Sequence, residues 1–258
     1  MRRLVVEMPP SLAAGWSRRL AWFAVLVVGI AVLLARLDRI EVAAALAVLG
    51  AGLFMAVTAV VLAVSGFVAI WNEGRPGFGA AAAGLFLATA LLAYPCFLAV
   101  QALRLPRLTD ISTDLNEPPA FSRSRRALEL RNGRTPPERT PQSRAEQSQA
   151  YPGIAPLTLE MQPSEVYALV QKAAAQRGWL VYESASPGGR TGVGRLEAID
   201  RSLIMRFPDD ITIRIRPTAV GARVDVRSAS RIGTHDFGSN ARRIQSFLQT
   251  LQELAEDR

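Results

Sequence analysis

The chain has 258 residues, half of them hydrophobic, and a formal net charge of +8. This length fits one large domain or two small ones, and the uneven distribution of the hydrophobic residues favours division. The charge is uneven too: residues 1–150 carry 16 basic and 10 acidic side chains, whereas residues 151–258 carry 14 and 12. Because the C-terminal part is nearly neutral, we expect no nucleic-acid partner.

Three apolar runs predict a transmembrane region over residues 1–104, with spans at about 18–36, 42–70 and 78–103. A bilayer core about 30 Å thick needs about 20 helical residues, so the second and third runs are long enough to cross. The first run holds only 16 uncharged residues between Arg19 and Arg36 and is marginal. A buried hairpin of a soluble protein would need polar faces, which these runs lack. A cleaved signal peptide is an alternative for the first run, but Asp38, Arg39 and Glu41 stand where a cleavage site should be neutral.

The arginines that flank the spans are nearly balanced between the two sides of a three-span bundle. One side has Arg2, Arg3, Arg18, Arg19 and Arg75, and the other has Arg36, Arg39, Arg104 and Arg107. Since four arginines precede the first span, the positive-inside rule favours a cytoplasmic N-terminus in an inner or cytoplasmic membrane. Three spans then place the C-terminal domain outside the cytoplasm, and the orientation reverses if the first run does not cross.

Small residues recur at helical spacing within the spans. The rows are Ala43, Ala47 and Ala51, and Ala80, Gly84 and Ala88. Such rows let helices approach closely, so we expect the spans to pack together or against a second copy in a homo-oligomer. The apolar runs from Leu20 to Ala35, from Val42 to Ile70 and from Phe78 to Leu103 contain no charged side chain, which argues against transport.

The composition changes at Leu105 to Pro, Ser, Arg, Gln and Glu, which predicts a connector over residues 105–156. Within it, Ser122 to Gln149 has seven arginines, three glutamates and few apolar residues. We expect this part to be a flexible, solvated linker. Contact with anionic lipid headgroups is the alternative.

Residues 157–258 have the periodicity of a compact α+β domain. The predicted helices are Pro163 to Arg177 and Ser239 to Ala255, and the predicted strands are Leu157 to Glu160, Trp179 to Glu183, Val193 to Ile199, Ser202 to Phe207, Asp210 to Arg216 and Arg223 to Ser228. The expected fold is therefore an N-terminal α-helical transmembrane bundle followed by an α+β domain. That domain would be a mostly antiparallel sheet with helices on one face, similar to helix-grip folds.

Few residues suggest catalysis. The only histidine is His235, the only cysteine is Cys96 in the third span, and neither belongs to a metal-binding pattern. Asp209 and Asp210 are adjacent, so a strand would send them to opposite faces. The glycines from Gly188 to Gly194 precede a strand rather than a helix, which indicates a hairpin loop and not a phosphate cradle. We therefore predict no catalytic residue, no metal and no cofactor.

The segment from Asp225 to Arg243 is the best candidate for ligand binding, because it joins a charged strand, a Gly-rich turn and a helix start. The candidate residues are Asp225, Arg227, Arg231, Asp236 and Asn240. The arginine forks suit a carboxylate or phosphate. The alternative is structural: Asp236 or Ser239 caps the last helix, and Asp225 pairs with a neighbouring arginine.

Four motifs carry a resemblance to a family: TDISTDLNEPPAF at residues 109–121, Trp179, FPDDITIRI at residues 207–215, and DVRSASRIGTHDFGSNARR at residues 225–243. Together they resemble the DUF1499 family over roughly residues 106–255. The resemblance implies the domain, and it implies no catalytic residues and no assigned activity. This chain differs by an Arg-rich insertion before Tyr151 and by the three spans.

The expected function is a non-catalytic binding or scaffolding module at the cell envelope, with the lipid bilayer and either envelope proteins or an anionic ligand as partners. An envelope enzyme that acts on an acidic or lipid-linked substrate is the alternative. It requires a cleft between the sheet and the final helix. In a third hypothesis the bundle is the functional part and the soluble domain regulates it.

Overall fold

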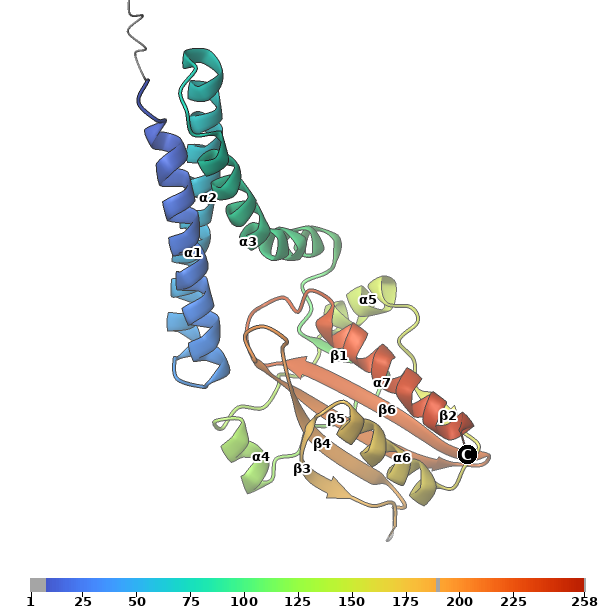
Figure 1. Ribbon diagram of the computed structural model, residues 1–258. Helices are drawn as coiled ribbons and strands as arrows, with labels where there is room; N and C mark the ends of the chain where they lie inside the picture. Colours follow the sequence, from blue (N-terminus) through green and yellow to red (C-terminus); the bar gives the residue numbers. More distant parts are fainter. Residues whose placement is uncertain (1–7, 189–190, 258) are drawn as a thin grey trace, which may run out of the picture. The chain divides into compact units, whose positions relative to one another are not determined.

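The computed structural model describes residues 8–188 and 191–257. The chain divides into two compact units, one ending at Val100 and one starting at Gln101 (Figure 1). Arg2, Arg3 and Gly189, which the sequence-based predictions used, lie outside the described residues.

Three long apolar helices form the first unit: α1 (Leu12–Arg36), α2 (Val42–Glu73) and α3 (Phe78–Arg104). Each is long and apolar enough to cross a membrane, so each of the three predicted spans falls on a helix of sufficient length and hydropathy. α1 begins earlier than expected, because the Ser11 side chain caps it by accepting a hydrogen bond from the Ala14 N–H. The resulting helix has 25 residues, and its uncharged run is the 16 residues between Arg19 and Arg36.

Small residues bring these helices into contact. In α3, Gly84 and Ala88 are buried as expected, and a Cβ atom at Gly84 would lie 2.1 Å from Ser17 Oγ of α1. In α2, Ala43, Ala47 and Ala51 are exposed, so this row does not pack against the other helices of the same chain, and its packing against a second copy stays a prediction. The buried residues of α2 are Ala45, Gly52, Ala56, Ala59, Ala63 and Gly66. In an Ala-rich helix several rows have the required spacing, so spacing alone does not identify the buried one.

The second unit is built on a six-stranded antiparallel sheet. Its strands are β1 (Asp110–Ser112), β2 (Leu157–Leu159), β3 (Leu180–Ala185), β4 (Gly194–Arg201), β5 (Pro208–Thr218) and β6 (Gly221–Ser230). The spatial order is β1-β6-β5-β4-β3, and β2 also pairs with β6. β1 pairs with residues 227–229 and β2 with residues 222–224, so the two short strands follow one another along the same edge. Gly221 is required there, since a Cβ atom would lie 2.1 Å from the Leu159 carbonyl oxygen.

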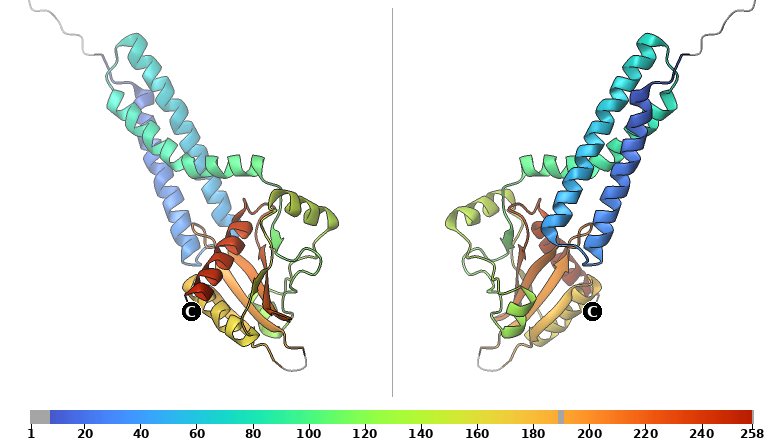
Figure 2. Two further views of the ribbon diagram at one scale, coloured as in Figure 1. Left: turned by 90° about the vertical axis from the view of Figure 1, so that its right-hand side faces the viewer. Right: turned by 90° about the vertical axis from the view of Figure 1, so that its left-hand side faces the viewer.

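Helices α6 (Pro163–Gln176) and α7 (Ser239–Glu256) cover one face of this sheet, which confirms the expected α+β architecture (Figure 2). The buried core lies between them and the inward side chains of the strands, such as Ile213 and Val226. Trp179, three residues after the end of α6, stacks on Phe247 of α7 with ring centroids 4.9 Å apart. Burial of these aromatic and aliphatic side chains holds the helices on the sheet.

Residues 202–207 form a turn instead of the predicted strand. The Ser202 N–H donates to the Phe207 carbonyl at 2.9 Å, and Arg206 adopts a φ of 53°. The segment thus connects β4 and β5 as a hairpin loop. Alternation of apolar residues over so few positions does not distinguish such a loop from a strand.

The opposite face of the sheet is covered by residues 113–140, drawn in green in Figure 2. This segment includes α4 (Arg125–Leu130), and α5 (Pro141–Ala150) follows it. The expectation of a flexible, solvated linker from Ser122 to Gln149 was therefore wrong. Its apolar residues are few, but Arg131 and Gln147 are almost fully buried and hydrogen-bonded, so polar contacts replace an apolar core here. We call this face of the sheet the polar face.

Candidate anion-binding site

The polar face arises from the alternation of side chains along β5 and β6. Ile211, Ile213 and Ile215 point to the apolar core, so the even-numbered residues of β5 point to the opposite face. In β6, Val224 and Val226 face the core, which turns Asp225 and Arg227 outward in the same way. In a sheet that is covered on one face only, these charged residues would face water. Here residues 113–140 enclose them.

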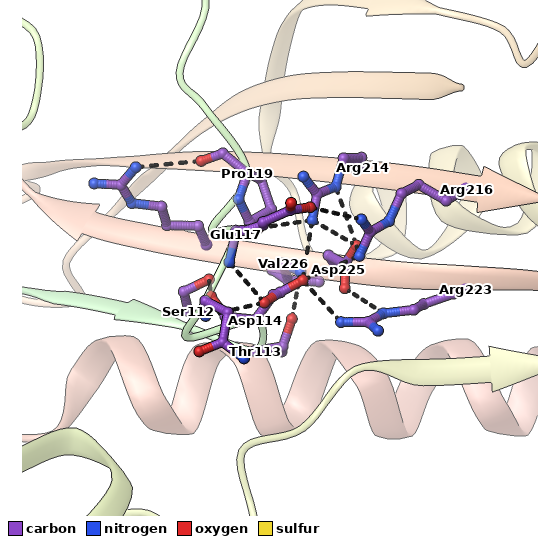
Figure 3. Close-up of polar contacts among 12 residues, drawn as sticks. Ser112, Thr113, Asp114, Glu117, Pro119, Arg214, Arg216, Arg223, Asp225 and Val226 are labelled. Carbon is purple, nitrogen blue, oxygen red and sulfur yellow. Dashed lines mark hydrogen bonds and ion pairs between the residues drawn. The ribbon is translucent and has the colours of Figure 1, made fainter. Parts of the chain in front are cut away.

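Two aspartates organise one end of this face. Asp225 is fully buried, accepts hydrogen bonds from Arg214 and Arg223 at 2.8–3.1 Å and forms an ion pair with Arg216 at 3.0 Å (Figure 3). Asp114, from the segment that covers the face, bonds the same three arginines at 2.9–3.2 Å. Burial raises the pKa of Asp114, but hydrogen bonds from the Glu117 and Asn116 N–H groups and the charge of Arg223 lower it by more. This cluster attaches the covering segment to the sheet.

A second cluster surrounds Arg131, just after α4. Its guanidinium donates to Asp210 at 3.2 Å, to Glu197 at 2.9 Å and to Tyr182 at 2.5 Å. It also donates to the Ser122 carbonyl at 2.7 Å. Burial raises the pKa of Glu197, and Arg131 opposes that shift. All three nitrogens of this buried guanidinium therefore have partners, as a buried charge requires.

Between the covering segment and β6 lies a pocket of about 480 Å³. It is lined by Pro118, Ala120, Phe121, Arg123, Thr135, Pro136, Pro137, Glu138, Arg139, Arg144 and Arg227. Four of these side chains are arginines and one is an acid. We call this cavity the arginine pocket.

Arg139 differs from Arg131 because most of its hydrogen-bonding capacity is unused. Its side chain is only 2% exposed, and it donates through Nη2 to Gln147. The buried Nε and Nη1 have no hydrogen-bond partner, and the nearest Asp110 oxygen is 3.9 Å from Nε, an ion-pair distance that is too long for a hydrogen bond. The buried Nε of Arg144 also has no partner. Burial lowers the pKa of Arg139, and the charges of Arg227 and Arg144 lower it further, although Asp110 opposes them.

The residues predicted from sequence do not form one site. Asp225 and Arg227 lie on the polar face, where Asp225 is surrounded by the three arginines described above. Arg227 is paired with Asp110 at 2.6 Å and lies over the Phe121 ring, 4.8 Å from its centroid. Of the predicted residues, only Arg227 lines the arginine pocket.

The other three predicted residues have structural partners. Arg231 pairs with Asp210 at 2.7 Å, and Asp236 caps α7 by accepting hydrogen bonds from the Gly238 and Asn240 N–H groups. Asn240 bonds Ser228 on the helix-covered face. Because Asn240 and Asp225 lie on opposite faces, they cannot line a common cleft between the sheet and α7. The capping role that we considered as the alternative is what the geometry shows for Asp236.

Sequence reasoning missed Arg139 and Arg144, which lie in the stretch interpreted as a linker. One signal was present: Thr140-Pro141 is an N-cap residue followed by a proline at the first helical position, which predicts the start of α5. The excess of arginine over glutamate in the same stretch was a second signal. Without the fold, however, nothing indicated that these arginines would be buried.

Comparison with known proteins agrees with the motifs. A family model described as protein of unknown function (DUF1499) matches residues 110–251, which include the whole sheet and most of α7. No curated protein and no solved structure gives a match. The match extends over more than half of the chain, so this protein, with three helices able to span a membrane, belongs to the DUF1499 family.

Proposed function

We propose that this protein is a membrane-anchored, non-catalytic module whose C-terminal domain binds an anionic ligand in the arginine pocket, on the outer side of the cytoplasmic membrane. The observation that carries the proposal is Arg139, whose buried guanidinium has two N–H groups without a partner beside Arg144 and Arg227. An unpaired buried donor costs about 1–3 kcal/mol, and more when it is charged. A bound anion would supply both the missing acceptors and the missing negative charge.

The chemistry of the pocket favours binding over catalysis. Arginine remains protonated at all ordinary pH values, so it does not serve as a general acid or base. Glu138 is the only acidic residue that lines the pocket, and no histidine, cysteine or lysine is among the described lining residues. Among the described residues no group of three or more metal-ligand side chains is present either.

Charge-removing variants of the full-length protein in phosphatidylcholine nanodiscs test this proposal. Three aromatic anions that differ only in the charged group serve as probes: 4-nitrophenyl phosphate, 4-nitrophenyl sulfate and 4-nitrobenzoate. We expect at least one to bind, and Arg144→Gln and Arg139→Gln to weaken it by about tenfold or more, because a hydrogen bond to a charged group contributes about 1.5–3 kcal/mol. Isothermal titration calorimetry measures the dissociation constants.

Arg125→Gln is the matched control, because it removes one positive charge from a side chain that is 93% exposed and lies outside the pocket. It should leave the affinity unchanged. Binding that persists in Arg144→Gln, or the absence of binding for all three probes, would refute the anion-binding role. Release of 4-nitrophenolate from the phosphate ester by wild type but not by Arg144→Gln would refute the non-catalytic role.

A further inference from the structure

We infer that the ligand of the arginine pocket is an organic phosphate monoester. This inference rests on the proposed function, since it specifies the anion that the same pocket binds. Its basis is the number of unpaired donors, the excess of positive charge, and the size and apolar walls of the cavity.

The unpaired donors match one compact anionic group. Arg139 contributes Nε and Nη1, and Arg144 contributes Nε, which gives three buried donor nitrogens from two neighbouring guanidinium groups. A phosphate monoester carries three strong acceptor oxygens on a single phosphorus atom. A carboxylate has only two acceptor oxygens, so two of these donors would have to share one oxygen.

The charges at the pocket favour a dianion. Arg123, Arg139, Arg144 and Arg227 line it, and the acidic groups facing them are Glu138, also in the lining, and Asp110, which pairs with Arg227. Four positive charges against two negative charges leave an excess of two. A phosphate monoester has a charge of about −1.5 to −2 at neutral pH, whereas a sulfate ester has a single negative charge.

The arginine pocket is larger than the phosphate group of a ligand requires. Pockets for small organic ligands are about 300–1,000 Å³, and the arginine pocket has about 480 Å³. Pro118, Pro136, Pro137 and Phe121 give it apolar walls beside the arginines. Such walls can hold the organic part of an ester, which inorganic phosphate lacks.

The second ionisation of the phosphate provides the test. Its pKa is about 6 in a phosphoserine, and the electron-withdrawing nitrophenyl group lowers it in the probe, so the dianion fraction still increases between pH 5 and pH 7.5. Using full-length protein in phosphatidylcholine nanodiscs, we expect the affinity for 4-nitrophenyl phosphate to increase from pH 5 to pH 7.5 in proportion to the fraction of the dianion. Any titration of Asp110 or Glu138 affects both esters, so 4-nitrophenyl sulfate, whose charge is constant, corrects for it. The ratio of the two affinities is therefore the measured quantity.

A ratio that does not change with pH would overturn the phosphate assignment, as would binding of the sulfate or 4-nitrobenzoate at least as tight as that of the phosphate at pH 7.5. Anion binding would then still stand if Arg144→Gln abolished it. If none of the three probes binds, the proposed function fails as well. The two failures can thus be told apart.

The same phosphate monoester group occurs in soluble metabolites and in the headgroup of phosphatidic acid. Nanodiscs that contain phosphatidic acid distinguish these sources from each other, with phosphatidylglycerol, an anionic phosphodiester, as the control lipid. Competition with 4-nitrophenyl phosphate by phosphatidic acid alone would support a lipid monoester. If neither phosphatidic acid nor phosphatidylglycerol in the disc lowers the affinity for the probe, the result would support a soluble phosphate monoester. Equal competition by both lipids would contradict recognition of the monoester.

Discussion

Arg131 and Arg139 show how differently two buried arginines can be accommodated in one domain. Arg131 has hydrogen-bond partners on all its guanidinium nitrogens, including two carboxylates. Arg139 has one hydrogen-bond partner, an ion-pair contact with Asp110 at 3.9 Å and two positively charged neighbours. A guanidinium whose N–H groups all have partners in the protein contributes to the stability of the fold. A guanidinium with unpaired N–H groups is also available to a ligand.

Arg131→Gln should therefore destabilise the domain strongly, because it leaves Glu197 buried without a positive partner. Breaking a buried ion pair costs about 3–5 kcal/mol. Adding Glu197→Gln should recover part of this loss, since it removes the uncompensated charge. Urea unfolding of the second unit, followed by near-ultraviolet circular dichroism of the full-length protein in detergent, measures the change. Arg125→Gln should stay within about 0.5 kcal/mol of wild type.

The alternation of charged residues in β5 and β6 could be predicted from the sequence, and so could the paired role of Asp225. The burial of Arg139 and Arg144 could not, because both line a pocket with Arg227 of β6, which is far away in the chain. Arg131, for example, bonds Glu197 and Asp210 more than 60 residues away. Local composition contains no information on such partners, so an Arg- and Pro-rich stretch with few apolar residues resembles a linker.

At the scale of elements, α1 and α3 approach closely where a glycine permits it. Gly84→Leu should separate the two helices, because even a Cβ atom would lie 2.1 Å from Ser17 Oγ and 2.8 Å from the Arg18 nitrogen. We expect a lower thermal midpoint for the helical circular dichroism signal in detergent. Gly50→Leu is the control, since a Cβ atom there has no neighbour within 4 Å. Equal midpoints for the two variants would contradict the close packing of α3 against α1.

The elements themselves were mostly predictable. Three long apolar helices lie at the predicted spans, and the helix that starts at Pro163, the hairpin around Gly221 and the last helix are confirmed close to the expected residues. The errors fell on the Ser202–Phe207 loop and on α4 and α5. These are short elements held by specific polar contacts, such as the Ser124 cap of α4, and long hydrophobic periodicity is absent from them.

At the scale of the whole molecule, the proposed orientation requires that an odd number of spans separate the two termini. A reporter that is active only outside the cytoplasm, fused after Arg258, should give a signal, and a reporter active only inside should give none. Fusion of the same reporters after Arg75 should give the opposite pattern, because that loop follows the second helix. Cytoplasmic activity of the C-terminal fusion would invert the proposed topology and would place the arginine pocket among cytosolic anions.

The pairing of both β1 and β2 with β6 has a consequence for biosynthesis. The spans contact near neighbours in sequence and can associate while translation continues. Residues 110–112 and 157–159, in contrast, have no strand partner until residues 221–230 have been made. At about 5–20 residues per second, this delay lasts several seconds or longer. A nascent chain of this protein is therefore anchored well before its soluble part can fold, and every truncation upstream of β6 should leave that part a substrate for chaperones and proteases.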